Sequence, residues 1–112
     1  MERNAKKTAE QLAAYQTYEK MLKATALREE EGGRERTGER VMLTMRMREI
    51  ERLLRELPIG NVRLLLELHY LQGMSVEGCA AQMGISRATA FRLKQRGLCM
   101  VAARTNRLAD HA

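Results

Sequence analysis

The chain is poor in aromatic side chains and in proline. Among its 112 residues there are three Tyr, one Phe, no Trp and one Pro. Valine and isoleucine are also scarce, whereas residues that favour helices, such as Ala, Leu, Met, Arg, Glu, Lys and Gln, dominate. A chain of this length forms one domain at most, with room for an appended helical segment. We therefore expect an all-α fold with a modest core and no two-domain enzyme cleft.

The sequence also lacks an apolar stretch long enough to cross a membrane. The strongest one, Val62 to Leu71, is interrupted by Arg63, Glu67 and His69 and is far shorter than the roughly 20 residues that a bilayer requires. The opening residues, Met-Glu-Arg-Asn, do not form the apolar core of a signal peptide. We expect a cytoplasmic protein with no membrane partner.

Cysteine and histidine are equally rare, with two residues of each kind. Cys79 and Cys99 fall at apolar positions of expected helices, which favours reduced packing residues over a disulfide. Together with His69 and His111 they have no spacing typical of a metal site. Paired carboxylates, a nucleophile triad and a Gly-rich phosphate loop are missing as well. The sequence therefore predicts neither an enzyme nor a bound metal or cofactor.

The positive charge is concentrated at one end of the chain. Residues 84–112 carry six basic residues and one acidic residue, so they hold +5 of the formal net charge of +6. A local excess of this kind attracts a polyanion, and nucleic acid is the first candidate. A solvated surface helix is the alternative interpretation of the same cluster.

Two amphipathic helices joined by a hinge are expected in the first half of the chain. Over residues 5–30, apolar and aromatic residues recur every three or four positions, as they do on one face of a helix. Residues 32–38 are polar and rich in glycine, which predicts a hinge. A second helix is expected over residues 39–56. Residues 1–56 would therefore form a helical hairpin.

The second of these helices carries the seam of a short heptad repeat. Its apolar residues are separated by four, three, four and three positions: Leu43, Met47, Ile50, Leu54 and Leu57. Two heptads alone make a weak coiled coil, so packing within the chain is favoured over a free-standing zipper. Arg46 and Glu51 flank the seam, where a parallel partner helix could exchange charge pairs. A homodimer formed through the N-terminal helices is therefore the alternative to packing within the chain.

A third helix is expected over residues 61–71, after Pro58 ends the second. Asn61 is suited to cap it, and Gly73 is suited to stop it. Leucines cover more than one face of this segment: Leu64, Leu65, Leu66, Leu68 and Leu71. Such a helix must be buried on several sides, so we expect it at the centre of the C-terminal bundle.

Two short helices separated by three residues follow, in the stretch VEGCAAQMGISRATAFRLKQ at residues 76–95. Ser75 can cap the first helix and Gly84 can end it, while Ser86 can cap the second, which begins at Arg87. A three-residue turn holds two helices near a right angle, as in the DNA-binding helix-turn-helix. The residues expected to face the shared core are small or apolar: Cys79, Ala80, Met83, Ile85, Ala90 and Leu93. The spacing thus predicts a helix-turn-helix.

The helix that begins at Arg87 turns a polar and basic face away from its apolar side. Arginine can bind guanine and glutamine can bind adenine in bidentate fashion, while alanine and phenylalanine can touch thymine methyl groups. Hydroxyls, lysines and helix N-terminal amides can hold phosphates. We predict that this helix lies in the major groove of duplex DNA and contacts it through the following residues: Ser86, Arg87, Ala88, Thr89, Phe91, Arg92, Lys94, Gln95 and Arg96. Phe91 has a second interpretation, because it could instead cover side chains of the third helix.

Several short pieces of the C-terminal half match a known pattern: Leu57-Pro58, HYLQG, Ser75 with Glu77 and Ala80, MGIS, and TAFRLKQRGL. With these pieces the chain resembles region four of bacterial sigma factors, and most closely the small phage and prophage transcriptional regulators of the RinA and ArpU kind. Gly97 departs from the usual alanine and is expected to let the last helix bend or end early. The N-terminal half shows none of the apparatus by which a full sigma factor melts a promoter.

The resemblance implies a sequence-specific regulator of transcription that binds double-stranded DNA. Its alternatives are a sigma-like adaptor that binds RNA polymerase and a small DNA-packaging subunit. We expect the chain to divide into a hairpin for packing or oligomerisation at residues 1–56, a three-helix helix-turn-helix unit at residues 57–104, and a flexible tail at residues 105–112.

Overall fold

The computed structural model describes residues 2–30 and 37–111, and helices joined by short turns make up this part of the chain. The elements are α1 (Glu2–Glu30), α2 (Thr37–Arg55), α3 (Asn61–Leu66), the π-helix η1 (Glu67–Leu71), α4 (Val76–Met83) and α5 (Arg87–His111). These ranges contain no strand, so the all-α prediction is confirmed. None of their helices combines the length and the apolar character that a bilayer span requires.

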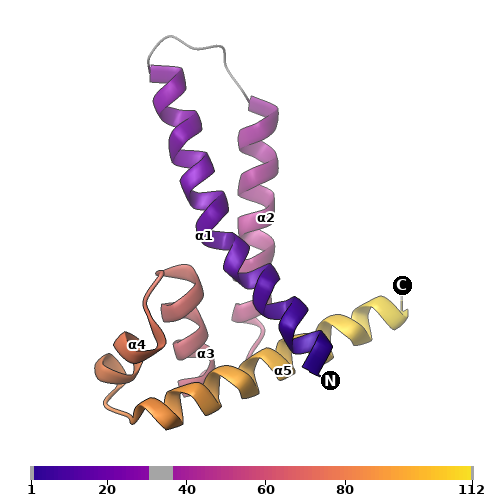
Figure 1. Cartoon of the computed structure of the whole chain (residues 1–112). Helices are drawn as coiled ribbons and strands as arrows, with labels where there is room; N and C mark the ends of the chain where they lie inside the picture. Colours follow the sequence, from indigo (N-terminus) through magenta and orange to yellow (C-terminus); the bar gives the residue numbers. More distant parts are fainter. Residues whose placement is uncertain (1, 31–36, 112) are drawn as a thin grey trace.

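The helices α1 and α2 lie side by side as an antiparallel hairpin (Figure 1). The predicted heptad seam is the buried side of α2: Leu43, Ile50 and Leu54 are buried and Met47 is half-buried. At its edge, the Tyr15 hydroxyl donates a hydrogen bond of 2.8 Å to the Glu51 carboxylate. The seam is therefore used within the chain. The predicted hinge falls mostly on residues 31–36, outside the described residues, although Thr37 and Gly38 already belong to α2.

The hairpin and the C-terminal helices share one core. Gln16 Nε2 on α1 donates to the carbonyl oxygens of Tyr70, at 3.0 Å, and Leu71, at 2.9 Å, and so ties α1 to η1. Near its N-terminus α1 also crosses α5 (Figure 1). The core combines side chains from both halves of the chain, among them Ala5, Leu12, Ile50, Leu54, Leu65, Leu66, Leu98 and Val101. Because α1 is held at two places, its position relative to α5 is fixed.

The predicted third helix is present, with two corrections at its start. Leu65 and Leu66 are fully buried at the centre of the molecule, as expected, but Leu64 is 44% exposed because no element covers that side. Asn61 is not the cap. Gly60 occupies the N-cap position, and no side chain caps the helix, so Asn61 is simply its first residue.

The end of this helix widens into the π-helix η1. The amide of Gln72 donates to the carbonyl of Glu67 at 3.2 Å, five residues back rather than four. The carbonyls of Tyr70 and Leu71 that this geometry leaves free are those that accept from Gln16. Gly73, with φ of 73°, then reverses the chain, as predicted from its place after the helix. The widened turn thus serves the docking of α1.

Candidate nucleic-acid interface

The turn between α4 and α5 has the geometry that the sequence predicts. The hydroxyl of Ser75 caps α4 by accepting from the amide of Gly78 at 3.0 Å. Gly84 ends α4 in the left-handed conformation, with φ of 70°. The amide of Ile85 then donates to the carbonyl of Ala80 at 3.0 Å, which satisfies an acceptor at the end of the helix. Few residues other than glycine adopt this conformation without strain, so Gly84 sets the angle between α4 and α5.

The start of α5 is fixed by a second cap. Ser86 Oγ accepts from the amide of Thr89 at 3.1 Å and donates to Thr89 Oγ1 at 2.8 Å. The predicted cap is therefore present. Its hydroxyl is committed to the helix, so a phosphate bound here would be held mainly by the free amides of the first turn and by the Thr89 hydroxyl.

The inner side of α5 packs against the shared core. Ala90 is buried and Leu93 is half-buried, as predicted. Gly97 is buried where α5 approaches α3: a Cβ at this position would lie 2.6 Å from Leu66 Cδ1 and 2.9 Å from Val62 Cγ1. Gly97 does not end the helix, as one of the two expectations had it; the glycine permits close packing of α5 against α3. The helix continues to His111, so residues 105–111 are helical.

The outer side of α5 is open and basic. Ala88, Arg92, Gln95 and Arg96 are exposed on neighbouring turns of one helix face. The guanidinium of Arg92 makes only a weak intrahelical contact, 3.4 Å from Nε to the Ala88 carbonyl. Neither Arg92 nor Arg96 forms an ion pair with any described residue. Both arginines are therefore free to bind an anion or a base edge.

Arg87 and Phe91 form one edge of this face. Arg87 is 71% exposed; its Nε lies 3.3 Å from Glu77 Oε1 on α4, and its guanidinium lies 5.5 Å from the centre of the Phe91 ring. Phe91 is 41% exposed and lines a groove with Ala5 and Ala9 of α1. The aromatic ring thus lies beside α1.

The two cysteines have opposite environments. Cys79 is buried in the core, and burial raises the pKa of its thiol. Cys99 is exposed, one turn beyond Gln95, whose Nε2 lies 4.0 Å from the sulfur. The prediction that both are packing residues was wrong for Cys99, because α1 and α3 cover the other sides of α5 at this level. Within the described residues, no cluster of side chains could hold a metal ion.

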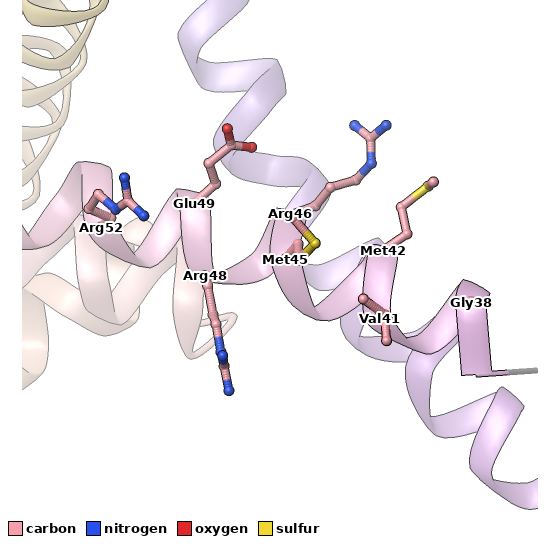
Figure 2. Close-up of a pocket in the computed structure, with 8 residues that line it drawn as sticks. All are labelled: Gly38, Val41, Met42, Met45, Arg46, Arg48, Glu49 and Arg52. Atoms are coloured by element: carbon pink, nitrogen blue, oxygen red, sulfur yellow. The ribbon is translucent and has the colours of Figure 1, made fainter.

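A second surface, which the sequence did not point to, lies on the outer face of α2. Val41, Met42 and Met45 are each more than half exposed there. Together with Arg46, Arg48, Glu49 and Arg52 they line a hollow of about 620 Å³. Figure 2 shows how these side chains lie along α2. The three apolar residues are outside the heptad seam, and the structure shows that they share an open face.

Residues 47–98 match the family model described as Sigma-70, region 4. The match runs from the middle of α2 through the turn to Leu98 and covers 52 of the 112 residues. Neither a curated protein nor a solved structure gave a significant match to the chain. The C-terminal half therefore carries a helix-turn-helix of the sigma-70 region 4 type, which indicates DNA binding.

Proposed function

We propose that this chain is a sequence-specific regulator of transcription that binds double-stranded DNA and is not an enzyme. In this proposal α5 lies in the major groove. The observation that carries it is the outer face of α5, where Arg92, Gln95 and Arg96 are exposed on a helix whose start is fixed by a cap. Arginine and glutamine are the side chains that read guanine and adenine in bidentate fashion.

The charge distribution supports the same orientation. Lys94 and Arg96 add positive charge to the outer side of α5, and the last 29 residues hold +5 of the formal net charge of +6. Phosphate contacts by such residues position a protein on the duplex, while the base edges supply specificity. Because each phosphate contact releases counterions, binding should weaken steeply as salt concentration rises.

We further propose that the protein is a phage or prophage regulator of the RinA and ArpU kind. This proposal rests on the resemblance of the C-terminal half, above all on MGIS and TAFRLKQRGL. In such a regulator the hairpin of α1 and α2 supplies packing for the helix-turn-helix and leaves an outer face for protein contacts.

Selection of bound duplexes from a random pool tests the proposal. A selected sequence whose binding falls with salt supports it, and a pool without selection overturns it. Arg92→Ala should cost about 1 to 3 kcal/mol of binding free energy and relax specificity at one base position. Lys20→Ala, which removes one exposed positive charge of α1 away from the proposed contact surfaces, is the control and should leave both unchanged.

A sigma-like adaptor that binds RNA polymerase is the second candidate. The observation that favours it is the exposed apolar patch of α2, formed by Val41, Met42 and Met45, because patches of this kind mark protein contacts. Co-purification with polymerase in the absence of DNA would support it. Loss of that complex in Met45→Glu, with DNA binding retained, would assign the contact to α2.

Whether the chain forms a homodimer or a larger multimer is tested separately from DNA binding. Because α1 covers the heptad seam of α2, a homodimer through the N-terminal helices would use another surface, such as the exposed outer face of α2. A selected palindrome with half-sites about one helical turn apart would report such a dimer. A ring-sized multimer in a mass measurement would instead favour a DNA-packaging subunit.

A further inference from the structure

A groove of about 290 Å³ runs between the N-terminal part of α1 and the outer edge of α5. It is lined by Ala5, Lys6 and Ala9 on one side and by Phe91, Lys94 and Gln95 on the other. Its floor is apolar and its rim is basic. Three of the side chains predicted to contact DNA therefore share one surface with a helix more than 80 residues earlier in the chain.

The lysines at the rim of this groove are not neutralised by neighbours. Lys6 is exposed and Lys94 is half-exposed. Neither forms an ion pair with any residue that the structure describes, and this includes Glu10, one turn after Lys6. Two unpaired ammonium groups beside one groove repel each other and attract an anion.

The backbone that carries Lys6 is held in place. Ala5 and Leu12, on the inner side of α1, are buried in the shared core. Further along α1, Gln16 donates two hydrogen bonds to η1, so the helix cannot slide along α5. The small side chains of Ala5 and Ala9 allow the close approach of the two helices. Lys6 thus stands at a fixed place relative to the exposed face of α5.

We infer that this groove binds a phosphate of the DNA backbone, and that Lys6 and Lys94 contact it from opposite sides. The inference rests on the proposed function, which it extends to α1. A major groove about 12 Å wide accommodates a helix about 10 to 12 Å across, so the flanks of an inserted helix lie near backbone phosphates. Lys94 and Phe91 mark such a flank of α5, and Lys6 extends it outward.

The experiment compares Lys6→Ala with Lys20→Ala as the duplex is titrated at several salt concentrations. Lys20 is exposed on the same helix, about 21 Å further along its axis at 1.5 Å per residue, and its replacement removes the same charge. The probes are the duplex selected from the random pool and an unrelated duplex. Thermal unfolding of each variant shows that the fold is retained.

We expect Lys6→Ala to weaken binding of both duplexes by a similar factor and to reduce the slope of log K against log salt by about 1. Lys20→Ala should leave the slope unchanged, and Lys6→Arg should retain it. An unchanged slope in Lys6→Ala overturns the inference, and tighter binding overturns it too, since α1 would then hinder the duplex. If the wild-type chain binds neither duplex, the proposed function itself fails.

Discussion

Arg87, the first residue of α5, is paired with Glu77 of α4, with 3.3 Å between Nε and Oε1. Both side chains are more than half exposed, so this ion pair contributes little to stability, about 0 to 1 kcal/mol. The pair is important because it determines the position of the Arg87 guanidinium. The pair holds a guanidinium over the Phe91 ring, at the edge of the face that we propose enters the major groove.

Glu77→Gln should therefore strengthen DNA binding. The substitution frees Arg87 and removes a negative charge beside the duplex, and the strength of an exposed pair limits the gain to about two- to fivefold. Titration of the selected duplex at low salt measures it. Glu19→Gln is the control. Glu19 forms an ion pair of the same length, 3.3 Å, with Lys23, and both residues lie in the C-terminal half of α1. Weaker binding in Glu77→Gln would contradict the prediction and would mean that Glu77 positions Arg87 for contact.

Gly97→Ala should destabilise the fold by overpacking the contact between α5 and α3. The added Cβ would lie 2.6 Å from Cδ1 of Leu66, which is fully buried, so that any shift of this side chain disturbs the core around it. Overpacking of this kind costs about 1 to 3 kcal/mol, which exceeds the gain of up to about 1 kcal/mol from helix propensity. Urea denaturation measures the difference. Gly38→Ala, where the Cβ meets nothing within 4 Å, is the control and should not destabilise; equal stability of the two variants would contradict the close contact.

Local features of the fold could be predicted from the sequence because they depend on neighbouring residues. Ser75 was placed correctly at the start of α4, and Gly84 and Ser86 at the two ends of the turn, since caps and left-handed turns are decided within about four residues. The heptad seam that ends at Leu57 was also found, because its spacing fixes one face of α2 whatever covers that face.

Features that depend on α1 could not be predicted in the same way. The hydrogen bonds that η1 accepts come from Gln16, more than 50 residues away. Cys99 was assigned to the core because the sequence does not show which sides of α5 are covered. Lys6 was missed for the same reason, since only the crossing of α1 and α5 brings it to the candidate site. Long-range packing, which leaves no local pattern, decided each of these cases.

Tyr15→Phe should change how stability depends on pH. Burial, together with the hydrogen bond to the Glu51 carboxylate, raises the pKa of Tyr15 from 10.0 to about 12. The folded state therefore favours the neutral phenol, and this stabilisation is complete below the unfolded value of 10.0 and lost as the pH rises through about 12. Denaturation at about pH 8 and about pH 11 should show a smaller alkaline loss in Tyr15→Phe than in wild type.

The same variant should be less stable than wild type near neutral pH, by about 1 to 2 kcal/mol, because it loses a hydrogen bond to a charged acceptor. Tyr18→Phe is the control, since Tyr18 lies on the same helix and makes no hydrogen bond with the residues that the structure describes. If wild type and Tyr15→Phe lose stability in parallel above pH 10, the bond to Glu51 does not link α1 and α2 as described.

The two thiols should react at very different rates, and DNA should change only one of them. Cys99 is exposed on the outer side of α5, whereas Cys79 is buried with a raised thiol pKa, so a thiol reagent should modify Cys99 first and Cys79 only on unfolding. Cys99→Ser should abolish the fast phase. Because Cys99 follows Gln95 by one turn, the selected duplex should slow its modification, while an unrelated duplex at the same concentration should slow it less. Full reactivity in the saturated complex would mean that only the first turns of α5 enter the groove, and it would remove Gln95 and Arg96 from the contact surface.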